Sequence, residues 1–249
     1  MSAMATRPGR DEIAEADSLA RREEILDAAT DLFAEFGYSD AVTQDLALKL
    51  QVGKGTIYRH YPSKRDLFLA AVDRVMRRMR IYIDEAVARF DDPLDQVREG
   101  TRAFLAFFAE HPKFVELLIL ERALFKDRKT PTYIEHRGRN QLRWLEVYRA
   151  LIAEGRVREM PVERISNVFV DLAYGTIFTN YFSGQARSPA EQARDIIDVV
   201  FLGILGESER GGSPVGDGGD PAGDVGTRGG RAVDPAPVVS PRKGGGSNA

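Results

Sequence analysis

A short basic stretch near the N-terminus holds the side chains best suited to binding a phosphate backbone. Between positions 49 and 65 the chain has no acidic residue and five basic ones: Lys49, Lys54, Arg59, Lys64 and Arg65. This local charge of +5 lies in a protein whose net charge is −3. Each phosphate neutralised by such a side chain releases counterions, so the stretch favours nucleic acid. A solvated basic face is the alternative interpretation.

The residues just before and within this stretch have the spacing of a short helix. Leu46, Ala47 and Leu50 recur at three- and four-residue steps, which places them on one helical face. Thr43 precedes them and is the expected N-cap, because its hydroxyl can accept from a free backbone N–H. Residues 51–53 then interrupt the pattern, which predicts a tight turn.

A second short helix is expected at residues 54–60. Ile57 points inward in this helix, and the remaining outward positions are polar: Lys54, Thr56, Tyr58, Arg59 and His60. Two short helices joined by a three-residue turn are typical of a helix-turn-helix, here at about residues 43–62. Because this pattern coincides with the basic residues, DNA binding is favoured over a solvated face.

The stretch from Ile25 to Phe68 resembles the DNA-binding domain of the tetracycline-repressor (TetR) family of bacterial regulators. The resemblance is carried by a Phe-Gly-Tyr turn, a threonine that opens the second helix, a valine before the recognition helix, a Gly-Thr-Ile-Tyr run within it, and an aromatic residue followed by Ser-Lys. In this sequence these are Phe36 to Tyr38, Thr43, Val52, Gly55 to Tyr58, Tyr61, Ser63 and Lys64. The close match covers about a fifth of the chain, and the helical remainder fits the family more loosely.

Two residues of the turn differ from the family pattern. Gln51 stands where the family usually has glycine, and Gly53 stands where it has serine or threonine. A left-handed backbone at Gln51 would cost about 1 kcal/mol. Gly53 is still expected at the N-cap of the second helix, without a side-chain oxygen.

The DNA contacts are assigned by position on these two helices. The candidates for base edges or the groove are Lys54, Thr56 and Arg59. The candidates for phosphates are Thr43, Tyr58, His60, Tyr61 and Lys64. Gly55, beside the N-cap Gly53, is expected to be small so that the backbone approaches DNA closely. For Tyr61, packing beneath the recognition helix is an alternative of equal weight.

The resemblance also implies the fold class and the division of the chain. It implies an all-α protein of about nine helices, in which a three-helix helix-turn-helix DNA-binding domain precedes a helical ligand-binding and dimerisation domain. We expect a disordered N-terminal segment at residues 1–18 and a DNA-binding domain at residues 19–80. An effector-binding and dimerisation domain is expected at residues 81–207, followed by a disordered Gly/Pro-rich tail at residues 208–249. A second interpretation of the first segment is an arm that binds the minor groove of DNA through Arg7 and Arg10.

Helical spacing outlines the rest of the chain. The first helix is expected at residues 19–36, with Gly37 as its C-terminal cap. A long helix follows Ser63, its N-cap, and keeps its apolar spacing to Phe90, so that it reaches from the DNA-binding domain into the next one. Its arginines are expected on a solvated face: Arg74, Arg77, Arg78 and Arg80. Further helices are expected at residues 93–110, 112–125, 131–154, 162–182 and 189–205.

The last two of these helices predict a dimer. From Val168 onward, the helix at residues 162–182 is apolar almost all round, which is typical of a helix buried on every side. A chain of this size has too little else to cover both helices. We therefore expect a two-fold dimer with a four-helix bundle at its interface, formed by Phe182, Ile197, Val200, Phe201 and Ile204 among others.

A small-molecule site is expected among the aromatic residues of the C-terminal domain. The resemblance implies an effector pocket between the fourth and eighth helices. Its candidate lining residues are Phe104, Phe108, Trp144, Tyr148, Tyr174, Phe178 and Tyr181, each of which also has the simpler interpretation of plain core. One hypothesis is that the effector is anionic and that basic side chains bind it; the alternative is that these side chains form a solvated face. The residues concerned are Arg122, His136, Arg139 and Arg143.

Composition excludes several other classes. The chain has no cysteine, which excludes disulfides and thiolate chemistry, and its three histidines lack metal-ligand spacing. The part expected to fold has no glycine-rich phosphate loop or Gly-x-Ser-x-Gly turn. We therefore expect no catalytic residue, metal or cofactor. No apolar run reaches the ~18 residues of a membrane span, and we expect a cytoplasmic bacterial protein without a membrane partner.

These observations predict a homodimeric transcription regulator, most simply a repressor. Such a protein binds a palindromic double-stranded DNA operator and is released by a small-molecule effector. It is cytoplasmic, and nucleoid-associated when bound to its operator. The alternative is a helical protein that binds a small ligand and has no operator specificity. Competition with unrelated DNA in a mobility-shift experiment separates the two.

Overall fold

The structure, a computed structural model, describes residues 10–184 and 187–203. Within these ranges every regular element is helical, which confirms the all-α fold class. The helices are α1 (Arg10–Asp40), α2 (Thr43–Lys49), α3 (Lys54–His60), α4 (Lys64–Val87), α5 (Pro93–Glu110), α6 (Pro112–Leu124), α7 (Thr132–Ala153), α8 (Val162–Ser183) and α9 (Pro189–Ile197), followed by a π-helical turn, η1 (Asp198–Leu202).

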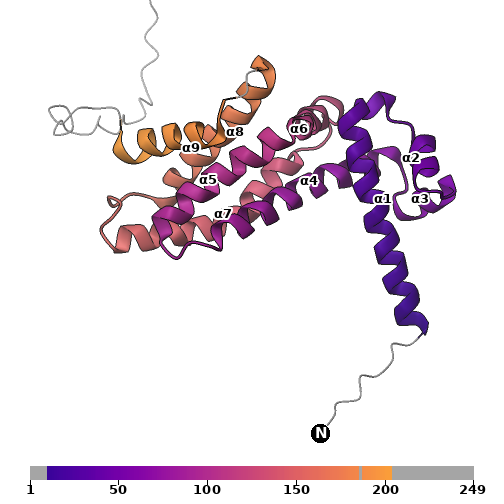
Figure 1. Cartoon of the computed structure of the whole chain (residues 1–249), viewed down its shortest axis with the longest axis horizontal. Helices are drawn as coiled ribbons and strands as arrows, with labels where there is room; N and C mark the ends of the chain where they lie inside the picture. Colours follow the sequence, from indigo (N-terminus) through magenta and orange to yellow (C-terminus); the bar gives the residue numbers. More distant parts are fainter. Residues whose placement is uncertain (1–9, 185–186, 204–249) are drawn as a thin grey trace, which may run out of the picture. The chain divides into compact units, whose positions relative to one another are not determined.

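The long helix α4 is the element around which the others pack. It contacts α1 at its start and α5, α6 and α7 along its length (Figure 1). Ser63 caps its N-terminus, since the Ser63 hydroxyl accepts from the Asp66 backbone N–H at 3.1 Å, as expected. One face of α4 is buried from Leu67 to Val87. The helix therefore belongs both to the N-terminal group α1–α3, which we call the head, and to the helices that follow.

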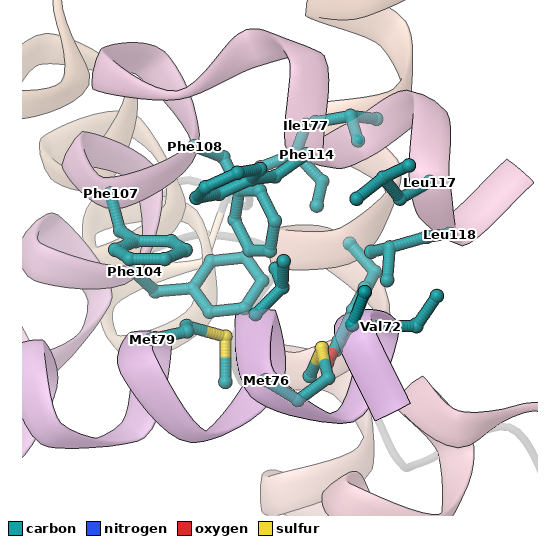
Figure 2. Close-up of a cluster of buried hydrophobic side chains, with 14 of the residues drawn as sticks. Val72, Met76, Met79, Phe104, Phe107, Phe108, Phe114, Leu117, Leu118 and Ile177 are labelled. Atoms are coloured by element: carbon teal, nitrogen blue, oxygen red, sulfur yellow. The ribbon is translucent and has the colours of Figure 1, made fainter. Parts of the chain in front are cut away.

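The core of the later helices combines phenylalanines of α5 with methionines of α4 and leucines of α6. Figure 2 shows Met76 and Met79 of α4 below Phe104 and Phe107 of α5, with Leu118 of α6 beside them. These side chains are at most 7% exposed. Burial of large apolar side chains, each contributing about 1.5–3 kcal/mol, holds α4 against α5 and α6.

Two of the four arginines of α4 differ from the expectation of a solvated face, whereas Arg77 and Arg80 are exposed as expected. Arg74 pairs with Glu23 and Asp27 of α1, and Arg78 donates to Asp27 at 2.6 Å. Sequence periodicity did not reveal these pairs because the partners lie about 50 residues apart. The ion pairs fasten α1 to α4 beside the apolar contact between the same two helices.

The N-terminal boundary also differs from the prediction. The segment at residues 1–18 was expected to be disordered, but α1 starts at Arg10, so residues 10–18 are helical. These residues have no apolar stripe, and the prediction relied on such a stripe; the helix-forming Glu15, Ala16 and Ala20 favour continuation of α1 instead. Residues 1–9 and the expected tail at residues 208–249 lie outside the described residues.

The described residues fall within one compact unit. The expected domains at residues 19–80 and 81–207 share α4, so the boundary at residue 80 passes through the middle of a continuous helix. Within the described ranges, no helix is both long and apolar enough to cross a membrane.

Candidate nucleic-acid interface

The turn between α2 and α3 fixes how α3 is presented. Gln51 has a φ of 53°, the left-handed conformation expected where the family has glycine. The Val52 N–H donates to the Ala47 carbonyl at 3.0 Å, and Gly53 is the N-cap of α3, without a side-chain hydrogen bond. Ile57 and Leu46 are fully buried between the helices. The inner face of α3 is therefore held by packing, and its other side faces solvent.

The exposed side of α3 carries most of the residues predicted to meet DNA. Lys54, Tyr58 and Arg59 are exposed, and Thr56 is half-buried. At Gly53 and Gly55 an added Cβ would meet no atom of the molecule within 4 Å. Packing inside the chain therefore does not require glycine there, and the open backbone leaves room for close approach by an external partner.

Thr43 occupies a different position from the one predicted. It is the first residue of α2, and Val42 is the N-cap, without a side-chain hydrogen bond. The Thr43 hydroxyl instead accepts from the Tyr58 hydroxyl at 3.3 Å. This bond links the start of α2 to the middle of α3 and brings two of the phosphate candidates together on the surface.

Lys64 lies at the start of α4 and reaches back over the head. Its Nζ donates to the Ser39 carbonyl at 3.1 Å and is 4.9 Å from the centre of the Tyr38 ring. The two contacts hold the ammonium group in place. The positive charge of Lys64 therefore lies at the same end of the molecule as α2 and α3.

Tyr61 follows the packing alternative. Its ring is 3% exposed, and its hydroxyl donates to the Arg22 backbone carbonyl of α1 at 3.3 Å. The side chain therefore supports α3 from beneath, and it is removed from the phosphate candidates. Its neighbour could not be inferred from the sequence because 39 residues separate the two.

His60 closes α3 and is half-buried, with an Nε2 atom that has no hydrogen-bond partner among the described residues. Burial, and then the charges of Arg59 and Arg22, lower the pKa of His60 below its ordinary 6.5. The ring is therefore neutral at pH 7, and its buried Nε2 offers no charge to a phosphate.

Arg22 is a basic residue of this surface that the sequence prediction missed. It is exposed on α1, and its guanidinium lies 5.7 Å from the centre of the Tyr61 ring. The tertiary contact between α1 and α3 adds its charge to the basic stretch at residues 49–65. We include it as a further phosphate candidate.

Comparison with known proteins agrees with this geometry. Residues 25–71 match the family model described as "Bacterial regulatory proteins, tetR family". The chain is 36% identical over 101 residues to the HTH-type transcriptional regulator YhgD of Bacillus subtilis, an alignment that covers 40% of this chain and 52% of YhgD. It is 26% identical over 197 residues to the HTH-type transcriptional repressor KstR2 of Mycobacterium tuberculosis, which covers 76% of this chain and 94% of KstR2.

The chain is similar to the TetR family of bacterial regulatory proteins: the family model matches residues 25–71, and the similarity to KstR2 spans 197 residues. Among solved structures, it shares the fold of the transcriptional regulator FadR from Bacillus subtilis, solved in complex with stearoyl-CoA. That match has a TM-score of 0.58 at 16% identity and covers 74% of this chain and 99% of FadR. At this identity the likeness shows the TetR fold alone.

The C-terminal helices line an apolar cavity of about 100 Å³, which we call the inner cavity. It lies among α4, α5, α7 and α8, and four of the predicted pocket residues line it: Phe104, Trp144, Tyr148 and Tyr174. The inner cavity also has lining residues that the aromatic pattern did not indicate, chiefly Gly100 and Ser166.

The other three predicted pocket residues lie elsewhere. Phe108 belongs to the core of Figure 2, with its ring 5.3 Å from that of Phe104. The Phe178 ring packs 6.3 Å from that of Tyr133, and the Tyr181 hydroxyl donates to Glu116 at 3.1 Å. None of the three lines the inner cavity.

The residues predicted for the dimer interface are divided between surface and core. Phe182 is 71% exposed, whereas Ile197 is 8% exposed and the Phe201 ring packs 5.3 Å from that of Phe169. Val200 is half-buried, and Ile204 lies outside the described residues. Within one chain α8 is not covered on every side, because Val168 and Leu172 remain 44% and 39% exposed; the prediction assigned the remaining cover to a second subunit.

The four residues of the anionic-effector hypothesis also divide. His136 is buried and pairs with Asp73 of α4 at 2.7 Å, and Arg122 is exposed on α6 away from the cavities. Arg139 and Arg143, with Arg80 of α4, line a second cavity of about 120 Å³ beside the first. We call it the outer cavity.

Proposed function

We propose that this chain is a DNA-binding transcription regulator, a repressor that binds a palindromic operator as a homodimer. The observation that carries the proposal is the exposed basic side of α3, with Lys54 and Arg59, held outward by the buried Ile57 within a helix-turn-helix. A helix of this size fits the major groove, where Lys and Arg donate to guanine and to phosphates. The relation to the repressor KstR2 supports repression as the sign of regulation.

Dimer formation is supported by the uncovered apolar face of α8. Val168, Leu172 and Phe182 are exposed at 44%, 39% and 71%, although such side chains are normally removed from water. A two-fold axis beside α8 would bury them against their own copies. The same axis would present two α3 helices to successive major grooves, about one helical turn or a multiple of it apart.

Release by a small molecule is supported by the inner cavity beside α4. A ligand that binds better to one arrangement of α4 shifts the equilibrium between DNA-competent and relaxed states. The structure of FadR with stearoyl-CoA supports small-molecule binding within this fold. We further propose that the chain acts by binding, without catalysis, in the bacterial cytoplasm where operators lie.

The experiment is a competition mobility shift with the full chain at physiological salt. A duplex selected by the protein should stay bound in a roughly hundredfold excess of unrelated duplex, because specific sites bind 10³–10⁷ times more tightly than others. Equal competition by unrelated DNA would overturn the proposal. That result favours the alternative of a helical ligand-binding protein whose head has no operator specificity.

A further inference from the structure

The two cavities of the C-terminal helices share a wall. Ile83 of α4 and Trp144 of α7 line both the inner cavity, of about 100 Å³, and the outer cavity, of about 120 Å³. Ligand sites in proteins commonly measure about 300–1,000 Å³. Each cavity alone is therefore small for a metabolite, and joining them requires the side chain between them to move.

The Trp144 ring is the movable part of that wall. It is half-buried and lies against Gly100 of α5, where an added Cβ would be 2.4 Å from Cη2 and 2.8 Å from Cζ2. Only a residue without a side chain admits the ring at this place. The absence of a Cβ at Gly100 thus lets Trp144 close the inner cavity.

The inner cavity offers an uncharged environment with one unsatisfied hydroxyl. None of its lining residues is charged at pH 7, since burial raises the pKa of Tyr148 and of Tyr174. Ser166 is 1% exposed, and its Oγ has no hydrogen-bond partner in the part of the chain that the structure describes. Leaving such a group unpaired costs about 1–3 kcal/mol, which a ligand oxygen would recover.

The outer cavity has the opposite character. Arg80, Arg139 and Arg143 line it with a single acid, Asp84, and Arg139 also pairs at 3.6 Å with Glu135 one turn earlier on α7, so that positive charge predominates at this cavity. Arg143 pairs with Asp84 and lies 5.8 Å from the Trp144 ring centre, while Arg80 Nε is 3.4 Å from the same carboxylate. Two guanidinium groups thus share one carboxylate, and a second carboxylate would complete the pairing.

We propose that the chain binds an elongated amphipathic carboxylate, with its apolar chain in the inner cavity and its carboxylate at Arg139 and Arg143, and that Trp144 leaves Gly100 to admit it. This inference rests on the proposed function and names the class of its effector. Arginine is suited to the head group because its planar guanidinium pairs with both oxygens of a carboxylate. The apolar lining of the inner cavity suits an unbranched hydrocarbon chain.

Trp144 makes the test direct, because it is the single tryptophan of the chain. Decanoate added to the full-length protein should change the intrinsic fluorescence saturably, and 1-decanol, with the same chain and no charge, should bind at least about tenfold more weakly. Equal affinity for the two compounds would overturn the anionic head group. Calorimetric binding of decanoate without a change in fluorescence would overturn the movement of Trp144.

Variants on α7 locate the head group. The double change Arg139→Gln and Arg143→Gln should bring the decanoate affinity within about threefold of the 1-decanol affinity, as expected when the charged partners are lost. Arg149→Gln is the matched control, because Arg149 is exposed on the same helix and pairs with Glu146. A double variant that folds by circular dichroism and still prefers decanoate tenfold would contradict the assignment.

Gly100→Ala tests the wall without a ligand. The new Cβ displaces the Trp144 ring, so the emission of the free variant should move toward that of the decanoate-bound wild type. An unchanged spectrum in a folded variant would contradict the mechanism. In the wild-type protein, a preference for the selected duplex without any binding of decanoate would overturn this inference alone. The absence of any preference among duplexes would overturn the proposed function, whether or not decanoate binds.

Discussion

Single residues of the head differ in whether they offer charge to DNA or support to the helices. Lys64, Arg59 and Lys54 are cations at the surface or held near it, whereas Tyr61 lies against α1 and the neutral His60 is half-buried. All five are polar and come within one short stretch of sequence. Their separation into two groups follows from the position of α1, which the short stretch does not contain.

Lys64→Ala should lower the magnitude of the salt slope of operator binding by about 1. The slope counts the phosphates neutralised, at about 0.9 per contact, and Lys64 accounts for one of them. The measurement is the dissociation constant from fluorescence anisotropy across a salt series. Arg158→Ala, which removes an exposed charge from the loop before α8, is the control and should leave the slope unchanged. A slope unaffected by Lys64→Ala would remove Lys64 from the contacts.

Gln51→Gly should raise the free energy of unfolding by about 0.5–1 kcal/mol. Gln51 has a φ of 53°, and a left-handed backbone costs a residue with a Cβ about 1–2 kcal/mol, part of which the entropy of glycine cancels. Gln44→Gly is the matched control. Gln44 is exposed within α2, so the same substitution should lower the stability by about 0.5–1 kcal/mol. Urea unfolding measures both, and a loss of stability at position 51 would contradict the account.

Among the elements, α4 connects the head to the cavities. Its middle pairs with α1 through Arg74 and Arg78 and with α7 through Asp73 and His136, and Ile83 near its end lines both cavities. A ligand that shifts α4 near Ile83 acts on a helix fastened to the head at its other end. The connection therefore consists of packing and ion pairs along one rigid helix.

Asp73→Asn should weaken the attachment of α4 to α7 above pH 3.8 and have less effect in more acidic solution. The hydrogen bond from His136, followed by the charge of Arg77, lowers the pKa of Asp73 below its ordinary 3.8 although burial opposes this. A lowered carboxyl pKa stabilises the folded state above pH 3.8, and this stability is lost as the pH falls through the folded-state value.

Wild type should therefore exceed Asp73→Asn by about 1 kcal/mol at pH 7, a size appropriate to a partly exposed pair. The difference should shrink as the pH falls below 3.8, as far as both proteins remain folded in urea titrations. Glu159→Gln, at an exposed loop carboxylate, should change the stability by less than about 0.5 kcal/mol. A difference that stays constant with pH would show that the pair contributes packing rather than charge.

The sequence predicted most elements because their signals are local. Ser63 and Gly53 are at the N-caps as expected, and α5 begins and ends at the predicted residues. The pocket was predicted less well. Phe104 and Phe108 are four residues apart and share a helical face, yet only Phe104 lines the inner cavity, whereas Phe108 belongs to the core that includes Phe114 of α6 (Figure 2). Helical spacing does not contain that tertiary information.

For the whole molecule, the uncovered face of α8 decides between a monomer and a dimer. Phe182→Asp should convert the protein to a monomer in sedimentation velocity, because a charge cannot be buried without a partner in the proposed interface. Leu124→Asp is the control; Leu124 is 42% exposed at the end of α6, and its change should leave the dimer intact. A dimer unaffected by Phe182→Asp would place the interface elsewhere.

The central claim is that two copies of α3 read a symmetric DNA site. The most direct measurement is selection of random duplexes by the full-length protein at physiological salt, followed by sequencing. The account predicts enrichment of an inverted repeat whose half-sites lie about one helical turn or a multiple of it apart. Enrichment of no sequence, or of a single site without symmetry, would contradict it.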